Sequence, residues 1–134
     1  MNISYDDFSK VEIRAGKILT AEKIPDTDKL LKLSVDFGEY EPMSITLDGT
    51  EAPKVSIPKP RQIVSGISLY FPDPAVLVEK TCMFVTNLEP RMIRGYESNG
   101  MLFAVSTPEG AFSLLEPAVV DPSKGQIPPG TRAK

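Results

Sequence analysis

The chain has 134 residues, of which 41% are hydrophobic and 25% charged, so one globular domain with a single core is expected. It contains no histidine and one cysteine, Cys82, which excludes an internal disulfide and disfavours a transition-metal site and every histidine-based catalytic arrangement. No pair of carboxylates stands out and no Gly-rich phosphate motif occurs. The composition therefore predicts a protein that is not an enzyme and needs no metal and no cofactor.

The charge pattern and the first residues indicate the cellular setting. The opening MNISYDDFSK is polar and acidic, so no secretory leader is expected, and no apolar run is long enough to span a bilayer. These features predict a cytoplasmic protein with no membrane contact. The net charge of −3 comes from residues 1–60, so binding to phosphates would need a few converging cations and would have modest, salt-sensitive affinity.

Most of the chain is predicted to form β-strands. Five segments have the apolar, β-branched composition of strands: 11–24, 30–37, 61–69, 81–88 and 100–106. Inside the first strand, Gly16 interrupts the alternation and predicts a bulge or sharp bend. The proline and two aspartates of 24–29 predict a turn, and the proline at the start of 72–80 predicts a short helix.

Three other segments are less regular. Residues 1–9 are expected to open the chain with Tyr5 and Phe8 packed on the core. In 38–60, MSITL and KVSI form either a hairpin extension or part of a solvated loop. The tail is expected to contain a short strand at 111–117, followed by an extended packing arm.

The order of these elements predicts an all-β fold. A long bent strand, two strands, a short helix and two further strands are the order of the OB-fold, a five-stranded Greek-key barrel. We expect one domain over 1–134, with the barrel at about 7–106 and a C-terminal extension at about 107–134. OB barrels bind oligonucleotides on strands two and three and with the loops between strands 1–2 and 4–5, here 24–29 and 89–99.

The 89–99 loop is the most informative segment for function. It carries Arg91 and Arg94, and two guanidiniums three residues apart suit a phosphate-rich ligand. Tyr96 is a candidate for stacking on a base. Together with cations and polar groups elsewhere on the expected binding face, the candidate RNA-binding residues are Lys29, Lys32, Arg61, Arg91, Arg94, Ser98, Asn99 and Met101.

Each candidate has a structural alternative. The alternative for Arg61 is a cross-strand ion pair with an acid such as Glu39. The segment from Ser98 to Gly100 is suited to a turn, and Met101 to the core. The lysines are suited to an ordinary solvated surface.

Four blocks resemble a known family: DFSKVEIRAGKI (7–18), DKLLKLSVDFGE (28–39), RQIVSGI (61–67) and NLEPRMIRGYESNGMLFA (87–104). They are similar to the tRNA-binding domain of free-standing tRNA-binding proteins, which is also appended to bacterial methionyl-tRNA synthetase. The resemblance implies an OB-fold that binds tRNA by shape, as a homodimer formed through the C-terminal region, here 112–129. The chain departs from the family at Glu89 and Met92, where lysine is common.

The resemblance leaves three functions open. The first is a tRNA-binding protein, auxiliary to methionyl-tRNA synthetase. A related branch of the same fold resembles chaperones for exported proteins, which implies an unfolded polypeptide as the ligand of the same groove. A third alternative is an adaptor that docks on a synthetase and leaves the basic groove unused.

Overall fold

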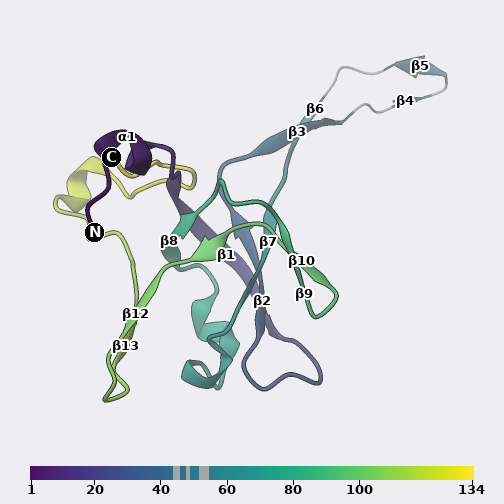
Figure 1. Ribbon diagram of the computed structural model, residues 1–134. Helices are drawn as coiled ribbons and strands as arrows, with labels where there is room; N and C mark the ends of the chain where they lie inside the picture. The colour runs from purple at the N-terminus through teal and green to yellow at the C-terminus, as the bar shows by residue number, and fades with distance from the viewer. Residues whose placement is uncertain (44–45, 48, 52–54) are drawn as a thin grey trace.

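The computed structural model describes residues 1–43, 46–47, 49–51 and 55–134. At its centre is an antiparallel five-stranded sheet, ordered β11 (Met101–Leu102), β8 (Thr81–Val85), β1 (Ile13–Lys23), β2 (Leu31–Asp36) and β7 (Arg61–Ser65). The sheet curls into a nearly closed barrel (Figure 1). The predicted OB-fold is confirmed.

The last gap in the barrel lies between β7 and the chain before β11. It is bridged by hydrogen bonds rather than by a strand ladder. The backbone N–H of Val64 donates to Oγ of Ser98 at 3.0 Å, and the backbone N–H of Asn99 donates to the carbonyl of Gln62 at 2.8 Å. These bonds hold the segment before β11 against β7.

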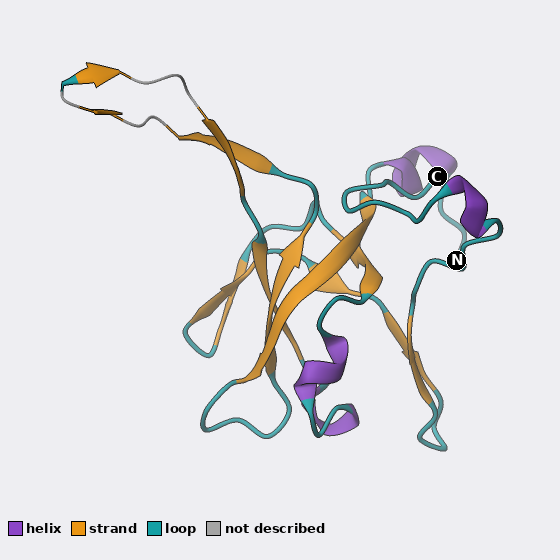
Figure 2. Ribbon diagram, turned by 180° about the vertical axis from the view of Figure 1, so that it is seen from behind, coloured by secondary structure: helices purple, strands orange, loops and turns teal. Residues whose placement is uncertain are grey.

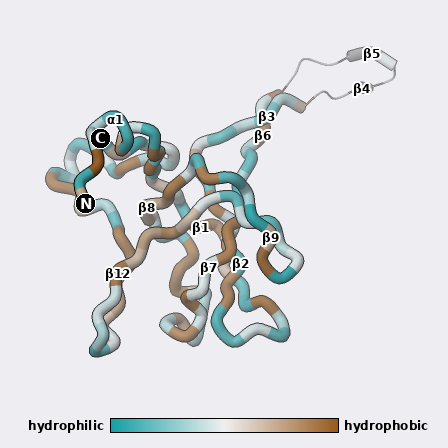
Figure 3. Tube along the Cα trace, in the orientation of Figure 1, coloured by the Kyte–Doolittle hydropathy of each residue, from teal (hydrophilic) through white to brown (hydrophobic). Residues whose placement is uncertain are grey.

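The barrel interior follows from the alternation in its strands. In β2, Leu31, Leu33 and Val35 are buried, and the residues between them lie on the outer side. Across the core, the rings of Phe37 and Phe84 meet edge to face at 5.2 Å. Figure 3 shows hydrophobic segments along the barrel strands and more hydrophilic loops at their ends.

Gly16 in β1 has a different role from the predicted bulge. The register of β1 against β2 shifts between Ile18 and Thr20, after the glycine. An ideal Cβ on Gly16 would lie 2.5 Å from Cε1 of Phe37 and 2.6 Å from Cγ1 of Val35. Glycine is therefore required because the core packs directly onto the backbone of β1.

Two short 3₁₀ helices join β7 to β8: η1 (Ser68–Tyr70) and η2 (Pro74–Leu77). The helix predicted at 72–80 is thus present but reduced to one turn. Asp73 caps it through a hydrogen bond from the backbone N–H of Ala75, at 3.1 Å, and Leu77 is buried. The turn ends early because Val78 is extended and Glu79 has a left-handed φ of 75°.

The opening segment forms a short helix, α1 (Tyr5–Ser9), capped by Ser4. The expectation that Tyr5 and Phe8 pack on the core is wrong, because their exposed fractions are 80% and 46%. Asn87 fixes the chain just after the helix: its Oδ1 accepts from the backbone N–H of Glu12 at 2.8 Å. The helix therefore lies outside the barrel, whose interior is filled mainly by side chains of the strands.

The described residues of 38–60 form a hairpin that projects from the barrel (Figure 2). Its pairs are β3 (Tyr40–Met43) with β6 (Val55–Pro58) and, farther out, β4 (Thr46–Leu47) with β5 (Thr50–Glu51). A hairpin is thus present, but its pairing differs from the one expected: the described part of KVSI pairs mainly with 41–43, and Thr46 and Leu47 of MSITL pair with β5. Residues 44–45 of MSITL and residue 54 of KVSI lie outside the described residues.

The C-terminal region returns to the barrel. β12 (Ala104–Ser106) pairs with β13 (Phe112–Leu114), which confirms the predicted strand, and a 3₁₀ turn, η3 (Pro122–Lys124), follows. The last residues then run beside β1, where the N–H of Gly130 donates to Ala15 at 2.7 Å and the N–H of Ala133 donates to Ile13 at 2.8 Å. No helix in the described ranges is long and apolar enough to cross a membrane.

Candidate nucleic-acid interface

The predicted 89–99 loop is itself a hairpin, made of β9 (Arg91–Ile93) and β10 (Tyr96–Ser98). Its two-residue turn is Arg94–Gly95, with φ values of 51° and 86°. Two successive left-handed residues are typical of a type I′ turn, whose twist matches that of the strands it joins. The turn places Arg94 at the tip of the hairpin.

The two faces of this hairpin differ. Ser98 is buried against the barrel, and Ile93 and Tyr96 are half-buried on the same face. Met92 and Glu97 are cross-strand partners on the outer face, where Met92 is 69% exposed. The hairpin thus packs against β7 with one face and exposes its other, partly apolar face to solvent.

Arg91 lies at the base of the hairpin beside a hollow of about 220 Å³. Among the residues that the structure describes, Arg91 forms no ion pair. The apolar side chains of Leu88 and Met101 border the hollow and are 47% and 45% exposed. Glu89 also lines it and opposes an incoming phosphate.

A second hollow lies between the hairpin tip and the 24–29 loop. It brings together Lys29 and Arg94, which come from segments far apart in the sequence. Both side chains are exposed, and neither forms an ion pair within the described part of the chain. Asp26 and Asp28 line the same hollow, so it contains charges of both signs.

The outer face of β2 and β7 adds polar groups between these hollows. Nζ of Lys32 lies 5.1 Å from the ring centroid of Tyr96 and 3.5 Å from Oε2 of Glu22. Ser34 and Gln62 are cross-strand partners beside it, and Nε2 of Gln62 donates to the carbonyl of Glu97 at 3.0 Å. Sequence analysis did not select Ser34 or Gln62, although the alternation in β2 and β7 places both on the outer face.

The guanidinium of Arg61 is bound within the protein, by Glu39 and Thr86. Its Nε and Nη2 donate to the two carboxylate oxygens of Glu39 at 2.7 and 2.8 Å, and its Nη1 donates to the carbonyl of Thr86 at 2.6 Å. The side chain is 17% exposed. The hydrogen bond from Arg61 lowers the pKa of Glu39. This is the ion-pair alternative for Arg61, so its charge is not available to a phosphate in the way that those of Arg91 and Arg94 are.

Ser98 and Asn99 take part in closing the barrel. Oγ of Ser98 accepts from Val64, and the backbone of Asn99 binds Gln62, as described above. For Ser98 this corresponds to the structural alternative. Met101 is not in the core, because nearly half of it is exposed.

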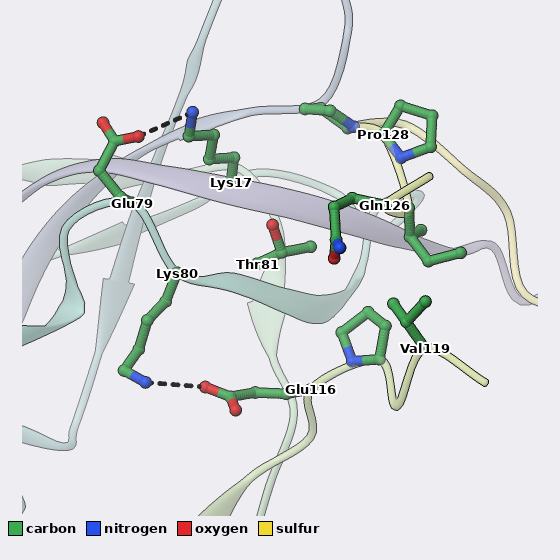
Figure 4. A pocket seen from close by; sticks show the side chains of 11 residues that line it. Lys17, Glu79, Lys80, Thr81, Glu116, Val119, Gln126 and Pro128 are labelled. Carbon is green, nitrogen blue, oxygen red and sulfur yellow. Dashed lines mark hydrogen bonds and ion pairs between the residues drawn. The ribbon is translucent and has the colours of Figure 1, made fainter. Parts of the chain in front are cut away.

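A larger hollow lies elsewhere, between β1, β8 and the C-terminal arm (Figure 4). Its charged side chains already neutralise one another: Lys17 pairs with Glu79 at 2.8 Å and Lys80 pairs with Glu116 at 3.2 Å. Since both lysines on its wall are paired, this hollow is less suited to phosphates than the Arg91 and Arg94 region.

Residues 13–131 match the family described as "Putative tRNA binding domain". Methionine–tRNA ligases of Myxococcus xanthus and Methanoregula boonei are 40% and 39% identical to the chain over 132 residues, or 98% of it. The chain spans only 15% and 16% of the length of these two relatives.

Solved structures agree with the match. A MetRS-related protein from Pyrococcus horikoshii is 34% identical, with a TM-score of 0.73 over 100% of this chain and 99% of that one. A chaperone CsaA from Bacillus anthracis, 20% identical, shares the fold with a TM-score of 0.70 over 100% of both chains. The family match and the methionine–tRNA ligase relatives show that this chain belongs to the tRNA-binding domain family.

Proposed function

We propose that the chain is a non-catalytic, structure-specific tRNA-binding protein that acts in the cytoplasm as a homodimer, auxiliary to methionyl-tRNA synthetase. The observation that carries the proposal is that Arg94 and Lys29 line one hollow and that Arg91 lies on the same hairpin as Arg94. All three lack an ion pair within the described residues. Family membership supports tRNA as the phosphate-rich ligand that such cations suit.

Recognition by shape follows from the chemistry of this surface. Two guanidiniums and a lysine can position a phosphate backbone, but such contacts do not distinguish one base from another. A-form RNA is read chiefly through its backbone, 2′-hydroxyls and shape, and the outer face of β2 and β7 carries the hydroxyl of Ser34 and the side-chain carbonyl of Gln62 as further polar groups. We therefore expect the protein to bind folded tRNA more tightly than unstructured RNA and to discriminate little between tRNA sequences.

An exposed apolar surface near the C-terminal hairpin supports the homodimer. The ring of Phe112 stacks on Tyr70 at 3.9 Å, and Leu69 and Val105 are 66% and 58% exposed. A second copy would cover these side chains and would double the number of converging cations. We expect Val105→Glu to convert a dimer into a monomer in sedimentation velocity. A protein that sediments as a monomer before substitution would contradict the dimer alone.

The central experiment is tRNA binding across a salt titration, with an unstructured RNA of the same length as competitor. The proposal requires that binding weaken as salt rises and that folded tRNA outcompete the unstructured RNA. Absence of binding at low salt would overturn it.

The exposed side chains of Leu88, Met92 and Met101 around Arg91 favour a second candidate. They make this surface partly apolar, and the fold is shared with a chaperone. In this alternative, an unfolded polypeptide occupies the groove and the arginines bind its carbonyls. Binding of a reduced, unfolded protein that tRNA does not displace would favour the chaperone.

A further inference from the structure

Tyr96 lies at the end of a row of side chains that crosses the outer face of the barrel. Glu22 on β1 and Lys32 on β2 are cross-strand partners, and Oε2 of Glu22 lies 3.5 Å from Nζ of Lys32. The same Nζ lies over the ring of Tyr96, which reaches it from β10. Three strands thus contribute one carboxylate, one ammonium and one aromatic ring to a continuous row.

This row fixes the position of the aromatic ring. An ammonium over a ring face is attracted by the negative quadrupole of the ring, and the ion pair with Glu22 restrains the same ammonium. The ring also belongs to a hairpin that Ser98 anchors to β7. A ring that is already ordered loses little conformational entropy when a flat ligand stacks on it.

The surroundings of Tyr96 indicate which flat ligand it takes. Arg94 lies in the turn of the hairpin, two residues before Tyr96. Arg91 lies on the same face of the β9–β10 hairpin as Tyr96. A nucleotide whose phosphate binds either arginine has its base within reach of the strand that carries Tyr96. A base pair buries its π-face in the helical stack, whereas an unpaired base is free to stack on an aromatic side chain.

We propose that Tyr96 stacks on an unpaired nucleobase of the bound RNA. Lys32 is then a positioning residue that holds the ring, with its ammonium directed at Tyr96 and Glu22 rather than at a phosphate. The inference rests on the proposed function and deepens it, because it adds a single-stranded contact to recognition by shape.

The test uses tRNA transcripts that carry the fluorescent base 2-aminopurine, either in the single-stranded 3′ end or in the anticodon loop. Stacking on Tyr96 quenches this fluorescence at one of the two positions. Tyr96→Leu is expected to abolish the quenching and to weaken tRNA binding by about tenfold, whereas Tyr96→Phe retains both. Tyr5→Leu, which removes an 80% exposed tyrosine on α1, is the matched control and should change neither.

A double-mutant cycle assigns the role of Lys32. If Lys32 acts through the ring, Lys32→Met weakens binding in the presence of Tyr96 and has little further effect in Tyr96→Leu. Additive effects would instead make Lys32 an independent phosphate contact and overturn the positioning role.

The failures of the two proposals are distinguishable. If the unchanged protein binds tRNA with the expected salt dependence but Tyr96→Leu leaves both quenching and affinity unaltered, the stacking inference alone is overturned. If the unchanged protein does not bind tRNA at all, the proposed function and this inference fall together.

Discussion

Arg61 and Glu39 form a two-pronged ion pair on the barrel, with Nε–Oε1 and Nη2–Oε2 distances of 2.7 and 2.8 Å. The guanidinium also lies over the ring of Phe37, with Cζ 5.4 Å from its centroid. Its remaining nitrogen donates to the carbonyl of Thr86. One cation thereby joins β7 to the segments that follow β2 and β8, and its charge is neutralised within the fold.

We expect Arg61→Met to lower stability without altering the salt dependence of tRNA binding. The substitution leaves the Glu39 carboxylate and the Thr86 carbonyl without their donor. The cost is limited to about 1–2 kcal/mol because Glu39 is partly exposed and water replaces part of the lost interaction. Urea unfolding measures the stability, and a salt titration of tRNA binding measures the slope. A slope reduced as much as in an Arg91 variant would place Arg61 in the interface after all.

Acid should destabilise the protein through Glu39 and Glu12. Hydrogen bonds from Arg61 to Glu39, and from Arg14 and Thr86 to Glu12, hold the pKa of each carboxyl below its ordinary value of 4.5. A lowered folded-state pKa stabilises the fold above about pH 4.5, and the stabilisation is lost as pH falls through the folded value.

The measurement for this prediction is the free energy of unfolding between pH 7 and pH 3. It should decline below about pH 4.5, and Glu39→Gln should decline less steeply than the unchanged protein. Equal slopes in the two proteins would contradict the contribution of Glu39.

Removing both hairpin arginines should weaken tRNA binding. Arg91→Ala/Arg94→Ala is expected to reduce affinity by about tenfold or more and to lower the salt slope by roughly 2, because two phosphate contacts are lost. The control is Lys124→Ala/Lys134→Ala, which removes the same charge from the C-terminal region and should have little effect. Unchanged affinity in the arginine variant would reject this site.

Glu89→Lys should have the opposite effect. Glu89 lines the hollow beside Arg91, so its carboxylate repels a phosphate that Arg91 attracts. Reversing the charge should strengthen tRNA binding several-fold at low salt and steepen the salt slope by about 1. Glu109→Lys, on the turn between β12 and β13, makes the same charge change away from the hollow. A similar gain in both variants would indicate a net-charge effect only.

Gly16→Ala should destabilise the barrel by about 1–3 kcal/mol, because the added methyl would overlap the Phe37 ring and Val35. Gly66→Ala is the matched control, since an ideal Cβ there has no heavy atom within 4 Å in the described structure. Thermal unfolding compares the two variants. Equal melting temperatures would show that the core relaxes around the extra methyl.

Much of the barrel was predictable because strand patterns are local. The alternation of apolar and polar residues in LLKLSVDF predicts β2 and its inner face within a residue at each end. The hairpin within 89–99 was missed, since its strands have three residues each and its Arg–Gly turn is a weaker signal than Asn–Gly. Ser34 and Gln62 were overlooked for another reason: uncharged polar residues on an outer face have no distinctive sequence signal.

The sequence by itself determined the fold class and the tRNA-binding family, because strand order, turn residues and the four sequence blocks are properties of chain order. It also presented Arg91 and Arg94 as the leading cations. Only the tertiary structure decided which cations remain available, because a pair such as Arg61 and Glu39 depends on where separate strands meet. The same holds for Lys32 and Tyr96: their 5.1 Å approach arises from the hairpin folding over β2 and β7, and no local pattern encodes it.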